Sequence, residues 1–174
     1  LSILAYQTLQ NKSSQIQKER AYQLLIKHNK QTLRQASQLL EELIKRGVLR
    51  ETSLTHIGFM DSNFQYICVA RKLKSLPFAL RKQFLLQQPQ KIIGFYAGLY
   101  PKMTKMTKSW IEDYKSVDTV FRSKGVQLTW VNPHLPALKY AALAVNNGEV
   151  EHTIVKELEH LLFALVQHKE HRLI

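Results

Sequence analysis

The chain has 174 residues, 45% of them apolar, which is enough to bury a core as one domain or as two small ones. No run of about eighteen apolar residues occurs, so the sequence predicts no membrane-spanning helix. The single cysteine, Cys68, excludes an internal disulfide and is consistent with a reducing cytoplasm.

Charge is the more informative property. The chain holds 25 Lys and Arg residues against 13 acids, which gives a net charge of +12 and an isoelectric point near 9.9. Residues 1–87 carry a net +9 and residues 88–174 a net +3. No Asp or Glu occurs from Ser62 to Ile111. Such one-sided charge favours a polyanionic partner through counterion release, but it does not distinguish DNA from RNA or from an anionic membrane.

Two helices are expected before residue 30. Residues 1–10 have an apolar face and form the first helix. A second helix is expected from Gln15 to about His28, with Ser13 or Ser14 as its cap.

The strongest helical signal covers residues 30–46. Apolar residues recur there three and four apart, the spacing of an amphipathic helix, and Thr32 is the expected cap. Lys45 and Arg46 suit the negative end of the helix dipole, and Gly47 stands where a left-handed stop is expected. The apolar stripe consists of Leu33, Ala36, Leu39, Leu40, Leu43 and Ile44, and the other face carries Arg34, Gln35, Gln38 and Lys45.

A small antiparallel sheet is expected next. Residues 48–52 form the first strand, 55–60 are short and apolar, and 64–69 are rich in β-forming residues after a turn at 61–63. The basic run 71–74 then ends the sheet region, either as a backbone contact or as a solvated charge run.

The pattern L-x-x-L-x-K-R-G-x-L from Leu40 to Leu49, with a strand after it, resembles the third helix and first wing strand of winged-helix regulators. The resemblance covers roughly the first seventy residues. It implies that the third helix lies in the DNA major groove and that Gly47 turns the chain into the wing. The alternative is an ordinary amphipathic helix that ends in a Lys-Arg-Gly stop.

The second part of the chain is expected to be helical apart from one strand. Met and aromatic residues step by three or four through 101–124, which is typical of a buried helix face. Lys102, Lys105 and Lys108 recur on the other side, as a second phosphate-contacting edge or as a solvated face. The expected elements are helices over 78–87, 101–124, 137–145 and 149–171, a strand over 126–131 and a turn at 132–136, with a boundary at 75–77. Residues 89–100 fit a buried helix or a strand, and helix is favoured.

No catalytic motif is evident in the sequence. Glu157 and His160 form an E-x-x-H step, but a di-metal site in a helical bundle needs a second such pair and further carboxylates. His168 and His171 also lack the ligands that would complete a metal site. A glycine-rich phosphate loop is missing. We therefore expect a protein that is not an enzyme and that uses no metal or cofactor.

These observations predict a mainly α protein with a small antiparallel β-sheet (α+β). Residues 1–74 would form a winged-helix-like nucleic-acid-binding module, and residues 75–174 a helical region for dimerisation or partner docking. The favoured function is sequence-selective binding of double-stranded DNA in the cytoplasm, associated with the nucleoid if the source is bacterial, by a transcriptional regulator or a replication or partition accessory factor. The residues expected to contact nucleic acid are Lys30, Gln31, Arg34, Gln35, Gln38, Arg50, Arg71, Lys72, Lys74, Lys102, Lys105 and Lys108.

Two other functions stay open. The first is RNA binding, or a subunit of a nucleoprotein complex, through the basic stretch 62–111. Exposed aromatics would support it by base stacking, and burial of the same aromatics would count against it. The second is a protein-interaction adaptor, to which Glu41 and Glu42 on the third helix lend weight. The aromatics in question are Phe95, Tyr96, Tyr100 and Trp110.

Overall fold

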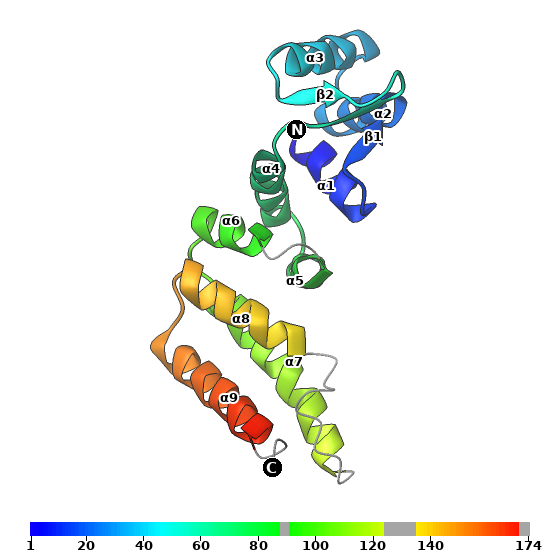
Figure 1. Ribbon diagram of the computed structural model, residues 1–174. Helices are drawn as coiled ribbons and strands as arrows, with labels where there is room; N and C mark the ends of the chain where they lie inside the picture. Colours follow the sequence, from blue (N-terminus) through cyan, green and yellow to red (C-terminus); the bar gives the residue numbers. More distant parts are fainter. Residues whose placement is uncertain (88–90, 124–134, 171–174) are drawn as a thin grey trace. The chain divides into compact units, whose positions relative to one another are not determined.

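The computed structural model describes residues 1–87, 91–123 and 135–170 (Figure 1). The chain divides into two compact units, Leu1–Pro77 (unit 1) and Phe78–Ile174 (unit 2). The described residues are mainly helical with one small antiparallel sheet, which confirms the predicted fold class. Every helix in these ranges is too short or too polar to span a bilayer.

Unit 1 combines helices with a three-stranded antiparallel sheet. The strand order is β1-β3-β2, so the strand from the start of the unit pairs with the last one. Ile16 pairs with Ile57 and Arg50 with Gly58. The elements are α1 (Ser2–Gln10), β1 (Gln15–Gln17), α2 (Lys18–Asn29), α3 (Leu33–Lys45), β2 (Leu49–Glu51), β3 (His56–Phe59) and α4 (Ser62–Lys74).

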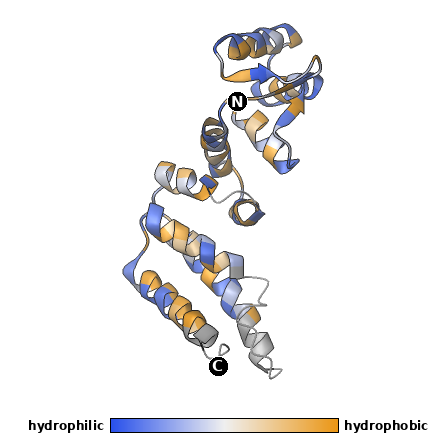
Figure 2. Ribbon diagram, viewed as in Figure 1, coloured by the Kyte–Doolittle hydropathy of each residue, from blue (hydrophilic) through white to orange (hydrophobic). Residues whose placement is uncertain are grey.

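Helix α3 forms as expected from its period and its ends. Ala36, Leu40 and Leu43 are buried, and the ribbon alternates between apolar and polar residues in Figure 2. Thr32 caps its first turn, and Gly47 follows it with a φ of 69°, a left-handed conformation that glycine adopts without strain. The expectation for Leu33 is wrong, because this side chain is 61% exposed.

The predicted start of the second helix is also wrong. Residues 15–17 form β1 rather than the first helical turn, and α2 begins at Lys18 with Gln17 as its cap residue. Ser13 and Ser14 therefore cap no helix. The error has a physical reason: β1 has only three residues, and its pairing with distant β3 leaves no local signal in the sequence.

The strand expected over residues 64–69 is a helix instead. The Asp61 carboxylate accepts hydrogen bonds from the backbone N–H groups of Asn63 (2.6 Å) and Phe64 (3.1 Å), which caps α4. Gln65, Cys68, Val69 and Leu73 are buried at helical spacing. The β-forming residues in a short window are therefore overridden by packing of this face.

Helix α4 packs on α1 through a buried polar contact as well as through apolar residues. The Gln65 side-chain amide donates to Thr8 Oγ1 (2.7 Å), and the Thr8 hydroxyl donates to the carbonyl oxygen of Ala5 (2.8 Å). Both side chains are buried, so the Gln65 amide depends on the Thr8 hydroxyl for its hydrogen-bond partner.

Unit 2 is helical in its described residues, and its core lies along α7 and α8. Met103, Met106, Trp110 and Tyr114 are buried, which confirms the expected apolar stripe. The Trp110 and Tyr140 rings lie 6.2 Å apart and join α7 to α8. The elements are α5 (Phe78–Gln87), α6 (Lys91–Leu99), α7 (Thr104–Ser123), α8 (Leu135–Asn147) and α9 (His152–Glu170). The strand expected over 126–131 lies outside the described residues.

Two ion pairs link α7 to its neighbours. Lys82 on α5 pairs with Asp113 at 2.8 Å and also donates to Ser109 Oγ at 2.9 Å. Lys115 pairs with Glu157 on α9, so Glu157 has a cationic partner.

The segments before α7 and α9 run side by side. The Met103 N–H donates to the Glu149 carbonyl (2.9 Å), and the Glu149 N–H donates to the Pro101 carbonyl (2.6 Å). A Cβ atom on Gly148 would lie 2.6 Å from Met103 Cγ and 2.9 Å from the Pro101 oxygen. Only glycine therefore fits this close approach without a shift of the backbone.

Candidate nucleic-acid interface

The N-terminal half of α3 presents polar side chains on the side opposite its buried stripe. Arg34, Gln35 and Gln38 are exposed on the helix, and Lys30 is exposed at the end of α2. Gln31, in the connection between α2 and α3, is half-buried and does not join this exposed group. We call Lys30, Arg34, Gln35 and Gln38 the α3 face. Its guanidinium, ammonium and amide groups can bind phosphate oxygens and base edges.

Gln35 has a structural task in addition to its exposure. Its backbone N–H donates to Thr32 Oγ1 (3.3 Å), and its side-chain Oε1 accepts from the Thr32 backbone N–H (2.9 Å). This reciprocal arrangement is a capping box, and it satisfies two donors that the helix itself leaves without partners. The T-x-x-Q spacing from Thr32 to Gln35 is visible in the sequence, although the prediction used only Thr32.

The C-terminal half of α3 and its cap carry two acidic and two basic side chains, Glu41, Glu42, Lys45 and Arg46. Glu42 pairs with Arg46 at 2.5 Å, and Glu41 accepts a hydrogen bond from Ser37 Oγ at 3.0 Å. Glu41 lines a hollow of about 140 Å³ between α2, α3 and the sheet, together with Lys18 and Glu51. The first half of α3 holds Arg34 and no acid, so a polyanion would meet uncompensated positive charge there rather than over the second half.

The β2–β3 hairpin lies next to α3 in the fold, because β2 packs against this helix. Arg50 is exposed on β2, and Glu51 pairs with Lys18 at 2.6 Å. Leu54, in the hairpin loop, is 93% exposed. The sequence analysis did not single out Leu54, and an apolar residue between two short strands gives no signal of its exposure.

The basic run at the end of the expected sheet has a different position from the one predicted. Arg71, Lys72 and Lys74 lie in the last turn of α4, not on a wing strand, and Lys72 is half-buried. Helix α4 packs on α1 and β3 and lies far from α3 within unit 1 (Figure 1). These three cations suit the negative end of the α4 dipole, and Lys72 also lines a hollow with His28 and Asn29 at the end of α2.

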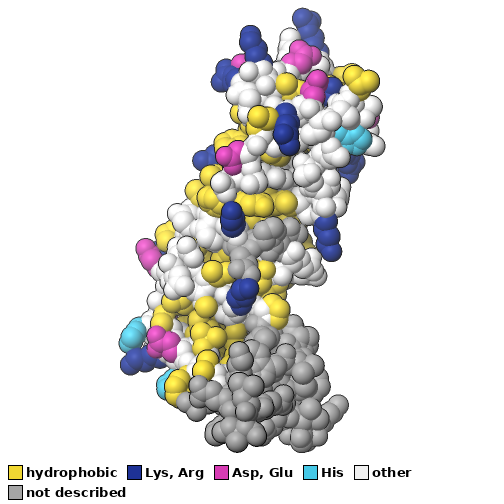
Figure 3. All heavy atoms as spheres, in the orientation of Figure 1, with side chains coloured by type: hydrophobic (Ala, Val, Ile, Leu, Met, Phe, Trp, Pro, Cys, Tyr) yellow, Lys and Arg dark blue, Asp and Glu magenta, His cyan; other side chains and the backbone are white. Residues whose placement is uncertain are grey.

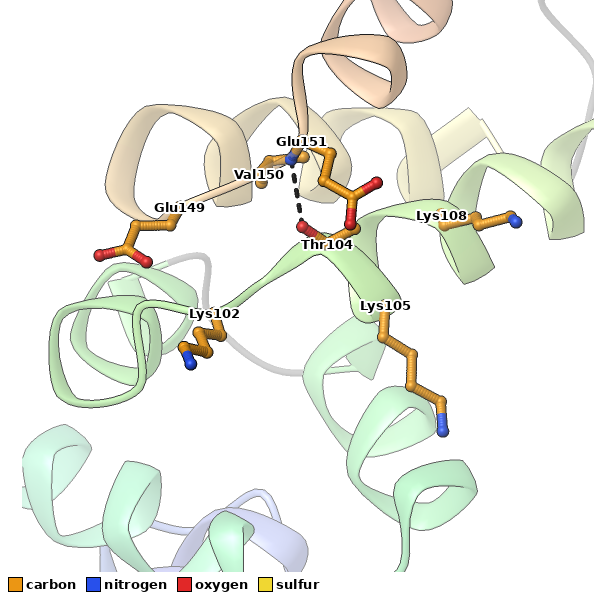
Figure 4. A pocket seen from close by; sticks show the side chains of 7 residues that line it. All are labelled: Lys102, Thr104, Lys105, Lys108, Glu149, Val150 and Glu151. Atoms are coloured by element: carbon orange, nitrogen blue, oxygen red, sulfur yellow. Dashed lines mark hydrogen bonds between the residues drawn. The ribbon is translucent and has the colours of Figure 1, made fainter.

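Unit 2 gathers the other three predicted lysines at one place. Lys102, Lys105 and Lys108 are exposed and line an open hollow of about 720 Å³ at the start of α7, together with Glu149 and Glu151. The three side chains point away from one another (Figure 4). Lys105 Nζ lies 4.9 Å from the centre of the Phe78 ring. This divergence fits contacts spread along an extended polyanion better than a pocket for one small anion.

The aromatic residues on which the RNA alternative depends are largely enclosed. Trp110 is fully buried and Tyr96 is 4% exposed, whereas Phe95 and Tyr100 are half-buried. The ring centres of Tyr96 and Tyr100 lie 5.1 Å apart. Arg81 donates a hydrogen bond to the Tyr96 hydroxyl at 2.6 Å. Trp110 and Tyr96 therefore offer no open face for base stacking.

Charge on the visible face is dispersed. Figure 3 shows Lys and Arg side chains standing apart from one another, with acidic side chains among them near α3. Within the described ranges, no three His, Cys, Asp or Glu residues lie close enough to hold a metal ion.

Comparisons of the chain with protein-family models, with curated proteins and with solved structures found no match.

Proposed function

We propose that this protein binds double-stranded DNA with sequence selectivity, and that the N-terminal half of α3 enters the major groove. The observation that carries the proposal is the division of α3 into two faces. Ala36, Leu40 and Leu43 anchor the helix in unit 1, while Arg34 and Gln38 extend outward from the same turns. A rigid helix that presents an Arg and a Gln to the solvent suits base-edge recognition.

The order of elements gives independent support. Unit 1 runs helix, strand, helix, helix, strand, strand before α4, and its sheet has the first strand beside the last. A strand directly after Gly47 is what the resemblance drawn from Leu40 to Leu49 implies, and β2 begins at Leu49. On this proposal α3 is the recognition helix and the β2–β3 hairpin is the wing.

Phosphate contacts would come from cations around the α3 face. Lys30 lies at its N-terminal side and Arg50 on β2, and both are exposed. Their contribution is electrostatic and does not depend on base sequence. The protein would act without catalysis or cofactor, as a transcriptional regulator or as a replication or partition accessory factor in the cytoplasm.

A protein-interaction adaptor is the second candidate, and exposed apolar residues favour it. Leu33 at the start of α3 is 61% exposed, Leu54 in the hairpin is 93% exposed and Met60 is 54% exposed. Exposed leucine and methionine side chains suit a protein surface better than a phosphate backbone. The α3 face would then contact an acidic partner chain.

The direct test is binding of the full chain to a labelled random duplex and to a single-stranded RNA of equal length, over a series of salt concentrations. The key variant is Arg34→Ala/Gln38→Ala. The matched control is Arg20→Ala/Gln23→Ala, which removes the same two residue types from exposed positions on α2 of the same unit.

We expect the wild type to bind duplex more tightly than RNA, with affinity that falls steeply as salt rises. The α3 variant should lose about tenfold or more in affinity for the duplexes that the wild type selects from the random pool, because each base-reading side chain contributes about 1–3 kcal/mol of discrimination against the wrong base. The α2 control should stay within about threefold of wild type. Equal losses in both variants would refute the role of α3, and absence of duplex binding at low salt would favour the adaptor.

A further inference from the structure

The capping box fixes the orientation of the Gln35 side chain. One terminal atom of the Gln35 side-chain amide lies 2.9 Å from the Thr32 backbone nitrogen. The same amide atom lies 3.2 Å from the Thr32 hydroxyl oxygen. A backbone N–H can only donate, so the atom that faces it must be the amide oxygen, Oε1. The amide cannot turn over without leaving this donor without its partner.

As a result, the Gln35 side chain can offer a ligand only hydrogen-bond donors and no acceptor. Oε1 accepts from the N–H and from the hydroxyl of Thr32, so both of its lone-pair positions are used. The Nε2 amino group keeps its two N–H donors, and the residue is exposed. Gln38, one turn further along α3, is exposed and takes no part in the cap. Gln38 can therefore offer a donor and an acceptor together.

Adenine and guanine present different hydrogen-bonding groups to such a side chain. Adenine presents an acceptor (N7) beside a donor (the N6 amino group), so a glutamine must use its oxygen and its nitrogen to bind both. Guanine presents two acceptors, N7 and O6, side by side, which suit two N–H donors. A glutamine with an engaged oxygen is thus mismatched to adenine and matched to guanine.

We infer that Gln35 specifies guanine at one position of the bound duplex, with its oxygen held by Thr32 and its amino group donating to the base. This inference rests on the proposed function, since it requires α3 to lie in the major groove. It assigns to the cap a second effect: the interaction that starts the helix also decides which base the helix prefers.

The test is selection of bound sequences from a pool of random duplexes by wild type, Gln35→Glu and Gln38→Glu. Glutamate at position 35 keeps an oxygen for the Thr32 N–H, as capping boxes commonly do, but replaces the amino donors by an acceptor. Gln38→Glu makes the same charge change on the same exposed side of α3, outside the cap. Melting temperatures of both variants close to that of wild type verify that the fold is retained.

We expect wild type to enrich guanine at a position where Gln35→Glu loses that preference by about tenfold or more, or changes it to cytosine, whose amino group a carboxylate accepts. Gln38→Glu should keep guanine at that position. If Gln35→Glu changes no base preference, or loses a preference for adenine, the inference is wrong although DNA binding stands. If wild type enriches no sequence, sequence-selective binding itself fails, and the inference with it.

Discussion

Cys68 lies on the buried side of α4 and is 5% exposed. Burial raises the pKa of its thiol above the ordinary value, which disfavours the reactive thiolate. We expect a thiol reagent to label Cys68 slowly in the folded protein at about pH 8 and rapidly in urea, where the pKa returns to about 8.5. Equal labelling rates with and without urea would show that the packing of α4 on α1 does not protect this residue from solvent.

The same shift gives stability a defined dependence on pH. The folded thiol keeps its proton to a higher pH than the unfolded thiol does. The contribution of Cys68 to the free energy of unfolding is therefore fully present below the unfolded pKa and declines as the pH rises past it. Above about pH 8.5, the free energy of unfolding should therefore fall less steeply with rising pH in Cys68→Ala than in wild type.

Gly148 tests the close approach of the two segments that precede α7 and α9. A methyl group at this position meets Met103 Cγ at 2.6 Å and the backbone oxygen of Pro101 at 2.9 Å. We expect Gly148→Ala to lower the free energy of unfolding by about 1–3 kcal/mol, the usual effect of overpacking. Trp110, buried in α7, gives a fluorescence signal for urea denaturation of unit 2.

The control for that prediction is Gly98→Ala on α6, where a Cβ has no neighbour within 4 Å. This change should leave stability unaltered or raise it by up to about 1 kcal/mol, because alanine favours a helix more than glycine does. A Gly148→Ala variant as stable as wild type would contradict the packing described.

At the scale of single elements, the first turn of α3 depends on Thr32. Thr32→Ala removes the oxygen that accepts the Gln35 N–H, and we expect a loss of about 1 kcal/mol in the stability of unit 1. Thr32→Ser keeps a hydroxyl at that place and should cost much less. Urea denaturation followed by circular dichroism measures both. An equal loss in the two variants would mean that the hydroxyl does not act as a cap.

Elements were predictable where their signals were local. Helix α3 combines a stripe spaced by three and four with a cap at Thr32 and a stop at Gly47, and all three signals agree. In α4 they conflict: residues 64–69 read as a strand, and only the Asp61 cap and the contact with α1 reveal the helix. Strand β1 has three residues and depends on β3 for its existence, so no local rule identifies it.

The candidate site was predictable to a similar degree. The exposed face of α3 follows from the buried stripe, so Arg34, Gln35 and Gln38 could be named from periodicity alone. The engagement of the Gln35 oxygen and the divergence of Lys102, Lys105 and Lys108 are matters of side-chain direction, which sequence spacing does not fix. The positions of Arg71 and Lys74 were predicted wrongly because residues 62–74 form a helix and not a wing strand.

For the molecule as a whole, positive charge is carried by both units, and unit 2 should contribute contacts without selectivity. We expect a Lys102→Gln/Lys105→Gln/Lys108→Gln variant to weaken duplex binding by a similar factor for all sequences and to make its salt dependence shallower. The control Lys91→Gln/Lys139→Gln/Lys156→Gln removes the same charge from exposed positions on three other helices of unit 2. A change in the preferred sequence, or equal effects from both triple variants, would argue against a lysine edge at the start of α7.

We propose that α3 is the surface of this protein that meets DNA. The most direct measurement is a titration of the nitrogen-15-labelled full chain with duplex DNA, followed by the backbone amide resonances. We expect the largest shifts on residues 34–38 of α3 and on Arg50 of β2, with smaller ones at Lys102, Lys105 and Lys108. Tight duplex binding with shifts confined to unit 2 would contradict it.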